Sequence, residues 1–165
     1  MEEACRESGG DEAMRIRKAS MGDAERIHAL VNFYASKEMM LPRSLSEICE
    51  TIRDFFVCEI DGEVVGCCAL QPVWLDLAEV KSLAVDERFW GRGIGSRLVR
   101  ACLEDALRLG VRRVFALTKI PAFFERLGFR QIDKEELPHK IWSECIRCPK
   151  FPNCDEVAVE IALRD

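Results

Sequence analysis

The sequence has no apolar run close to the roughly 18 residues that a membrane-spanning helix needs. Its first residues, MEEACRESGGDEA, are acidic rather than basic and then apolar, so we expect neither a membrane span nor a secretory signal. Basic residues are not in excess either, because the net charge is -5 and the pI is near 5.3. Nucleic-acid binders usually show a basic stripe. We therefore expect no membrane or nucleic-acid partner, and a cytoplasmic location.

An even set of cysteines behind a signal peptide, which is typical of a secreted disulfide scaffold, is also missing. The chain has nine cysteines, and several lie within apolar stretches, where we expect reduced thiols that act as small buried hydrophobic residues: Cys58, Cys67, Cys68 and Cys102. With 165 residues, 48% of them hydrophobic, the chain has room for one well-buried domain. We predict this domain over residues 14–165, after an acidic and disordered N-terminal tail at 1–13.

Residues 80–98, VKSLAVDERFWGRGIGSRL, combine a strand, a glycine loop and a helix start. The apolar run 83–85 leads through a charged turn to three glycines in five residues, followed by Ile94, Leu98 and Cys102 at a spacing of four. Unpaired N–H groups and the positive end of the helix dipole can bind phosphate oxygens at such a place. Taken alone, the loop could equally be a tight packing turn. The residues after it exclude a Walker loop, and the spacing fits a dinucleotide fingerprint poorly.

Hydrophobic periodicity and turn residues predict a mixed α/β chain. Asp61 and Gly62 favour a tight hairpin. Strands are expected at 15–19, 56–60, 64–70, 77–85, 111–117, 128–132 and 157–161, and helices at 24–36, from 45 to about 55, at 94–109 and at 120–127.

This order of elements, the glycine loop and the segment AFFERLGF at 122–129 resemble the GCN5-related N-acetyltransferase (GNAT) family. The resemblance covers Met14 to about Leu163. It implies a GNAT fold of the α/β (α+β) class: a mixed, mostly antiparallel sheet of about seven strands, helices on both faces, and central strands splayed to hold acetyl-CoA as the acetyl donor. A homodimer is a common form of this fold.

The resemblance also implies which residues bind the donor. The acyl and pantetheine arm would lie along Leu83, Ala84 and Val85, and the pyrophosphate would bind at Arg92, Gly93, Gly95 and Ser96. Strand amides near Leu83 would polarise the thioester, since fixed dipoles need no reorganisation when charge develops on its oxygen.

Two positions depart from the family pattern. Trp90 precedes the first glycine, where the family usually has Gln or Arg; because the phosphate donors are amides, we expect binding to survive. Phe124 occupies the place of a Tyr that many members use as general acid. Either another group donates the proton or none is needed, since a thiolate is a fair leaving group. We expect Phe124 to pack the short helix and flank the cofactor.

A closer resemblance is to amino-acid N-acetyltransferases, specifically short bacterial N-acetylglutamate synthases. It is carried by residues 41–44, 54–56, 79–84, 124–129 and 136–138. It implies acetylation of the α-amine of an amino acid, with L-glutamate as the acceptor, which is the first step of arginine biosynthesis. The alternatives are another small amine, a protein N-terminus, or a non-catalytic module that senses acetyl-CoA.

GNAT family members commonly have a carboxylate base at the start of the central strand, so the resemblance implies that Glu79 deprotonates the amine, directly or through water, with Asp76 in reserve. Arg43 is expected to bind a carboxylate of the substrate, because a guanidinium matches carboxylate geometry. Lys119 is a second candidate for substrate binding, and could equally be a solvated surface charge.

A cysteine-rich stretch precedes the last predicted strand. It contains His139, Cys145, Cys148 and Cys154, which are enough ligands for a structural zinc site of the Cys₃His type. The spacing is not that of a standard zinc finger. Our primary expectation is therefore no metal and a loop of reduced thiols over the substrate site, and a redox switch is a further alternative.

Overall fold

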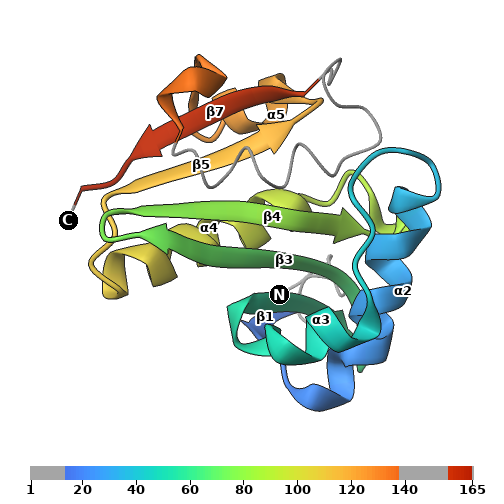
Figure 1. Ribbon diagram of the computed structural model, residues 1–165. Helices are drawn as coiled ribbons and strands as arrows, with labels where there is room; N and C mark the ends of the chain where they lie inside the picture. Colours follow the sequence, from blue (N-terminus) through green and yellow to red (C-terminus); the bar gives the residue numbers. More distant parts are fainter. Residues whose placement is uncertain (1–13, 138–155, 165) are drawn as a thin grey trace, which may run out of the picture. The chain divides into compact units, whose positions relative to one another are not determined.

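The computed structural model of the protein describes residues 14–137 and 156–164 (Figure 1). Its sheet has seven strands in the order β1-β2-β3-β4-β5-β7-β6. The β4/β5 pair is parallel, whereas β1/β2, β2/β3, β5/β7 and β6/β7 are antiparallel. The strands are β1 Met14–Lys18, β2 Phe55–Ile60, β3 Glu63–Trp74, β4 Leu77–Val85, β5 Arg113–Thr118, β6 Arg130–Ile132 and β7 Val157–Ala162. The predicted mixed, mostly antiparallel sheet is confirmed.

The described residues form four α-helices: α2 Ala24–Ala35 and α3 Leu45–Glu50 between β1 and β2, α4 Ile94–Arg108 between β4 and β5, and α5 Pro121–Glu125 between β5 and β6. The start of α3 follows from its sequence, because the Ser44 hydroxyl accepts a hydrogen bond from the Glu47 N–H at 3.1 Å. The Glu47 carboxylate in turn accepts from the Ser44 N–H at 2.9 Å, which completes a capping box. The expected continuation of this helix to Phe55 is wrong. The helix ends at Glu50, and Phe55 is the first residue of β2.

The hairpin between β2 and β3 turns where the sequence predicted. Asp61 and Gly62 have φ angles of 51° and 82°, the left-handed values that a two-residue turn of type I′ requires. In β2, Phe55 pairs with Ala69 of β3 and its side chain is fully buried. A helix that continued through Phe55 would take this residue out of the sheet. Tertiary pairing therefore overrides the helical spacing at this point.

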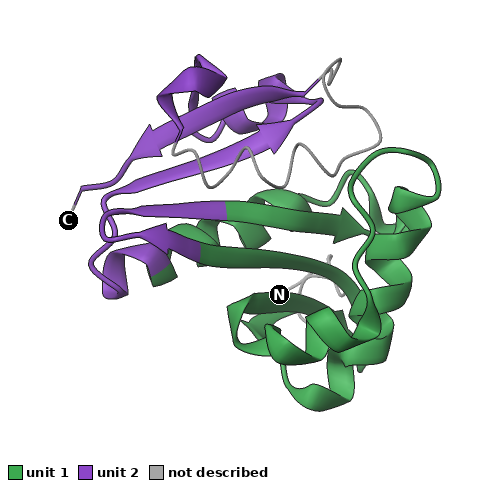
Figure 2. Ribbon diagram, in the orientation of Figure 1, with its two compact units in different colours: residues 1–71, 80–105 green, residues 72–79, 106–165 purple. Residues whose placement is uncertain are grey.

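The chain divides into two compact units (Figure 2). Unit 1 comprises residues 1–71 and 80–105. Its core packs α2 and α3 against β2, β3 and β4, and consists of Ala24, Ile27, Leu30, Val31, Tyr34, Ile48, Phe55, Val57, Val64, Cys67, Ala69 and Ala84. Helix α4 approaches the sheet closely at Gly66, where an added Cβ would lie 3.2 Å from both Ile94 and Leu98. A glycine is needed there for space.

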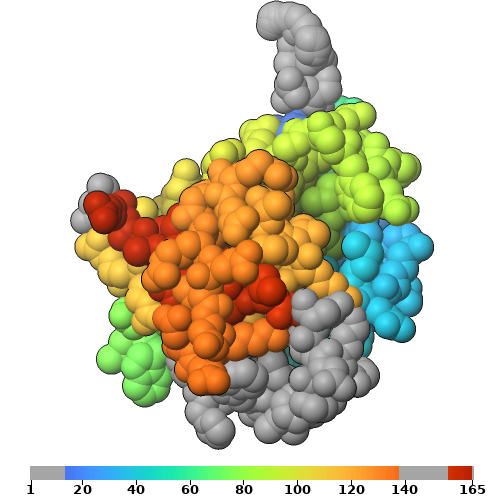
Figure 3. Space-filling model, turned by 90° about the horizontal axis from the view of Figure 1, so that it is seen from above, coloured from blue at the N-terminus to red at the C-terminus, as the bar shows by residue number. Residues whose placement is uncertain are grey.

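Unit 2 comprises residues 72–79 and 106–165. It has its own small core of Val73, Leu77, Phe115, Leu137 and Ala158. Figure 3 shows one face of the molecule, on which α5 and the segment after β6 are orange and β7 is red.

Thiols, membrane-spanning helices and metal-ligating clusters can be compared with the expectations over the described residues. The five cysteines within the described residues are free thiols, and Cys58, Cys67, Cys68 and Cys102 are buried as predicted. None of the described helices is long and apolar enough to span a membrane. No cluster of metal-ligating side chains occurs among residues 14–137 and 156–164. The alternative zinc site at His139, Cys145, Cys148 and Cys154 lies outside the described residues.

Candidate active site

The glycine loop between β4 and α4 is exposed and depends on the backbone freedom of glycine. Gly91 and Gly93 have φ angles of 84° and 75°, which residues other than glycine seldom adopt. A Cβ atom at either position would meet nothing within 4 Å. Glycine is therefore needed for conformation and not for lack of space.

The start of α4 has the properties of an anion site. Its first helical bond runs from the N–H of Arg97 to the carbonyl of Gly93 at 3.1 Å, so the N–H groups of Ile94, Gly95 and Ser96 have no partner within the helix. The positive end of the helix dipole lies at the same place. Arg92, directly before Gly93, is exposed and adds a cation. This combination can bind the oxygens of a phosphate or pyrophosphate group.

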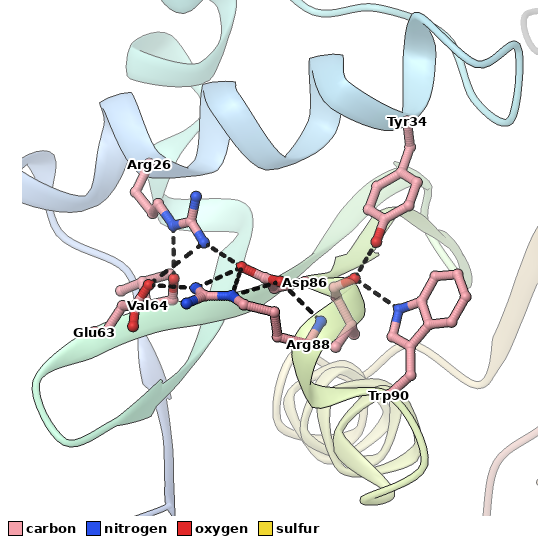
Figure 4. A network of polar contacts seen from close by, with 8 residues as sticks. Arg26, Tyr34, Glu63, Val64, Asp86, Arg88 and Trp90 are labelled. Carbon is pink, nitrogen blue, oxygen red and sulfur yellow. Dashed lines mark hydrogen bonds and ion pairs between the residues drawn. The ribbon is translucent and has the colours of Figure 1, made fainter.

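The end of β4 is held by two side chains that donate to one carbonyl. Trp90 Nε1 donates to the carbonyl oxygen of Val85 at 2.8 Å, and the hydroxyl of Tyr34 donates to the same oxygen (Figure 4). The two rings are stacked, with their centroids 6.3 Å apart and an interplanar angle of 18°. Tyr34 is buried in α2, and this burial raises the pKa of its hydroxyl. The hydroxyl therefore stays protonated and remains a donor.

The next residue, Asp86, is the centre of an ion-pair network. Its carboxylate lies 2.9 Å from Arg26 and 2.9 Å from Arg88, and Arg88 also lies 2.8 Å from Glu63. Hydrogen bonds from the Arg88 side chain are the main cause that lowers the pKa of Asp86 to about 2. Figure 4 shows that the Arg26 side chain extends from α2 to this network. The network therefore connects α2, the β2/β3 hairpin and the end of β4.

Arg43 is held against β4 at a residue with an unusual backbone. Ser82 lies within the strand and has a φ angle of 56°, a local irregularity of the kind that re-aims side chains. The guanidinium of Arg43 donates to the Ser82 hydroxyl at 3.1 Å and to the Thr51 hydroxyl at 3.2 Å. It also lies over the ring of Phe55, 5.4 Å from the centroid. The arginine is thereby fixed beside the residue that precedes Leu83.

Asn32 of α2 holds the backbone of the same arginine. Its Oδ1 accepts from the N–H of Arg43 at 3.2 Å, and its Nδ2 donates to the carbonyl of Arg43 at 2.8 Å. A guanidinium has five N–H groups in a fixed fork. With its position set by these bonds, Arg43 has the geometry to bind a carboxylate as well.

In unit 2, Glu79 lies in β4 with 6% of its surface exposed and pairs with Phe115 of β5. Phe115 in turn pairs with Glu160 of β7. Directly paired residues point to the same face of a sheet, so these three side chains share one face. Arg113 donates to both oxygens of Glu160, at 3.2 and 3.0 Å. A carboxylate buried beside Phe115, like that of Glu79, has the chemistry of a general base.

The other predicted residues of unit 2 differ in their surroundings. Phe124 in α5 is buried and packs edge-to-face against Phe123 and Phe129, with centroid distances of 5.0 and 5.1 Å. Its packing of the short helix is as expected, and its contact with a cofactor stays a prediction. Lys119 is exposed just after β5, and Asp76 is exposed in the turn between β3 and β4.

Residues 24–129 match the model of the acetyltransferase (GNAT) family. The chain belongs to the acetyltransferase (GNAT) family. This confirms the family that the glycine loop and the AFFERLGF segment indicated. A GNAT relative in Chlorobaculum tepidum, an uncharacterized N-acetyltransferase, is 44% identical over 144 residues, which cover 87% of this chain and 93% of the relative.

Two further GNAT relatives have more specific names. The amino-acid acetyltransferase of Mycobacterium tuberculosis is 37% identical over 135 residues, covering 80% of this chain and 77% of the relative. The structure of N-acetylglutamate synthase from Neisseria gonorrhoeae, complexed with coenzyme A and N-acetyl-glutamate, is similar with a TM-score of 0.85 and 27% identity. That comparison covers 92% of this chain, which spans 35% of the Neisseria chain.

Sequence reasoning missed the residues that position these groups. Ser82, Thr51 and Asn32 surround Arg43, and Tyr34 contacts the end of β4. Tyr34 is the single tyrosine of the chain, a signal that could have singled it out. The other three are common polar residues, and no local pattern distinguishes them.

Proposed function

We propose that this GNAT enzyme transfers the acetyl group of acetyl-CoA directly to the α-amine of an amino acid, with L-glutamate as the acceptor. The observation that supports this acceptor most directly is the fixed guanidinium of Arg43 beside β4. Binding of an α-amino acid requires a cation that pairs with its carboxylate, and glutamate has two carboxylates. The names of the Mycobacterium and Neisseria relatives support the same acceptor class.

The donor side of the proposal uses backbone groups. In it, the amides at the start of α4, with Arg92, bind the pyrophosphate, and the β4 residues Leu83, Ala84 and Val85 line the pantetheine arm and the thioester. The fit is supported by the left-handed φ angles of Gly91 and Gly93 and by the exposure of residues 91–93, which directly precede these amides. The bound thioester supplies the electrophile. The N–H groups of β4 would stabilise the negative charge that forms on its oxygen.

The acceptor side uses charged side chains. Glu79 would take a proton from the α-ammonium group, directly or through water, because only the neutral amine is a nucleophile. Arg43 would bind a carboxylate of the amino acid, and Lys119 is a second candidate for that role. Phe124 cannot donate a proton, so the thiolate would leave unassisted or take a proton from elsewhere. Synthesis of N-acetylglutamate would place the protein in arginine biosynthesis in the cytoplasm.

A second candidate function keeps the chemistry and changes the acceptor to another small amine or a protein N-terminus. The specific observation in its favour is the name of the Chlorobaculum relative, which is only that of an N-acetyltransferase. The match to this relative covers 87% of this chain. A non-catalytic module that senses acetyl-CoA is the third reading, and the lack of a tyrosine at position 124 supports it.

A thiol-release assay tests these alternatives. Purified protein is given acetyl-CoA with each of glutamate, glutamine, aspartate, lysine, spermidine and a peptide with a free N-terminus. We expect the highest kcat/KM with glutamate. We also expect Arg43→Lys to lower that value by about 100-fold, because an ammonium group cannot reproduce the fork of bonds. Faster turnover with another amine would replace glutamate, and CoA binding without turnover of any amine would favour the sensing module.

A further inference from the structure

The peptide group that joins Val85 to Asp86 is hydrogen-bonded on both edges. Its carbonyl accepts from the Tyr34 hydroxyl and from Trp90 Nε1, the latter at 2.8 Å. Its N–H donates to the carbonyl of Val65 on β3 at 2.8 Å. Because a peptide group is planar and rigid, bonds on both edges fix its orientation about the strand. Side chains from outside β4 therefore set the last peptide group of that strand.

Trp90 also connects this peptide group to the glycine loop. It directly precedes Gly91, and its indole reaches back to Val85 across the turn Glu87–Phe89. A loop with three glycines in five residues samples many conformations when it is unrestrained. A hydrogen bond and a ring stack at the residue that begins the loop remove part of this freedom before a ligand binds. Affinity then rises, because less conformational entropy is lost on binding.

Tyr34 anchors the arrangement in the core of unit 1. Its side chain is 4% exposed and belongs to the same hydrophobic cluster as Ile27 and Val31 of α2. The same helix also contacts Asp86 through Arg26, as Figure 4 shows. Thus α2 holds both residues of this peptide group, Val85 through a hydroxyl and Asp86 through a guanidinium. By contrast, Trp90 is 55% exposed, so its hydrogen bond does not follow from burial of the ring.

We infer that Tyr34 and Trp90 are positioning residues of the donor site. By donating to the carbonyl of Val85, they hold the end of β4 and the start of the glycine loop in the orientation that binds acetyl-CoA. The inference rests on the proposed function, which assigns β4 and this loop to the donor. Neither side chain is required to touch the reacting atoms.

The substitutions Tyr34→Phe and Trp90→Phe test this, since each keeps an aromatic ring and removes one donor. The dissociation constant of CoA is measured by calorimetry, and KM is measured separately for acetyl-CoA and for the acceptor amine. We expect each variant to weaken CoA binding and raise the KM for acetyl-CoA about two- to fivefold, with the KM for the acceptor changed by less than about twofold. A purely structural role would not separate the two KM values.

The double variant gives a sharper result. A carbonyl that keeps one donor is still satisfied, whereas one that loses both is not. We therefore expect the double variant to weaken CoA binding by more than the product of the two single effects. Matched controls are Trp74→Phe, at an exposed tryptophan in β3, and Ser36→Ala, which removes a hydroxyl at the end of α2. Both should bind CoA like the wild type.

The outcomes separate this inference from the proposed function. The positioning role alone would be overturned if the wild-type protein binds CoA and the CoA affinity is unchanged in Tyr34→Phe, in Trp90→Phe and in the double variant. Equal changes in both KM values would also overturn it. Wild-type protein that binds no CoA would overturn the proposed function and this inference together.

Discussion

Asn32 and Tyr34, two residues apart in α2, hold two different parts of unit 1. Asn32 bonds both backbone groups of Arg43, and Tyr34 donates to the carbonyl of Val85. One helix therefore sets both the arginine proposed for the acceptor and the strand end proposed for the donor. Because the proposed function assigns these two contacts to different substrates, their effects should separate in kinetics.

Replacement of Asn32 by alanine should affect the acceptor and not the donor. The change removes two hydrogen bonds to the backbone of Arg43, so the guanidinium loses part of its fixed position. We expect the KM for glutamate to rise about tenfold, with the KM for acetyl-CoA within about twofold of the wild type. Steady-state kinetics with each substrate varied in turn provide the measurement. Gln131→Ala, which removes an amide bonded to Glu125 on the surface, is the control and should change neither value.

Glu79→Gln should lower kcat without weakening the binding of acetyl-CoA. The amide cannot accept the proton of the ammonium group, and loss of a general base typically reduces the rate by about 10²- to 10⁴-fold. The difference in kcat between Glu79→Gln and the wild type should narrow as the pH rises, because a larger share of the substrate amine is then neutral without a base. The pH dependence of kcat for both proteins gives the test.

Two further variants complete that experiment. Asp76→Asn tests the reserve candidate for the base, and Glu25→Gln, at an exposed residue of α2, is the control. Both should retain wild-type kcat if Glu79 is the base. A large loss of kcat in Asp76→Asn with normal kcat in Glu79→Gln would assign the role of general base to Asp76.

Gly93→Ala should disturb donor binding beyond its effect on stability. A left-handed φ costs a residue with a Cβ atom about 1–2 kcal/mol, and relief of this strain would move the amides at the start of α4. The matched control is Gly110→Ala, because Gly110 has a φ angle of 85°, and a Cβ atom there also meets nothing within 4 Å. We expect both variants to lose similar stability in thermal melts, and only Gly93→Ala to raise the KM for acetyl-CoA, by about tenfold or more.

Asp86→Asn should lower the melting temperature at neutral pH by roughly 2–6 °C, since it removes charge-assisted bonds to Arg26 and Arg88. The effect should depend on pH with a definite sign. The pKa of Asp86 is about 2 in the folded protein and about 3.9 in an unfolded chain. A lowered folded-state pKa means that the stabilisation is present above pH 4 and is lost as the pH falls toward 2.

Thermal melts at several pH values test this directly. The difference in melting temperature between wild type and Asp86→Asn should be constant above about pH 5 and should shrink below pH 4. Glu135→Gln, at an exposed residue of unit 2, should show no difference at any pH. A difference that grows on acidification would contradict the assigned ion pairs.

The elements of the fold were largely predictable from the sequence, because they depend on local signals. The Asp61-Gly62 turn, the Ser44/Glu47 capping box and the four-residue spacing after Gly93 each specify a hairpin or a helix from neighbouring residues alone. Prediction failed at Phe55, whose spacing suits a helix but whose side chain is buried in the sheet. That choice depends on the pairing of Phe55 with Ala69 of β3, which local spacing does not reveal.

The candidate site was predictable only in part. The glycine loop and Arg43 could be singled out, since one is a local backbone motif and the other belongs to a segment that resembles known enzymes. The bonds that fix Arg43 could not, because Asn32 and Ser82 lie 11 and 39 residues away in the sequence. Such contacts arise from the packing of α2 and β4, and the residue types alone do not predict them.

The left-handed backbone of Ser82 also bears on how far the protein can be stabilised. A glycine would adopt this φ of 56° without the strain of about 1–2 kcal/mol that a side chain brings. The same change would remove the hydroxyl that accepts from Arg43. A screen for heat-resistant variants would therefore favour glycine at this position, and a screen for activity would favour serine. With Arg43 in its proposed role, stability and activity are opposed at a single residue.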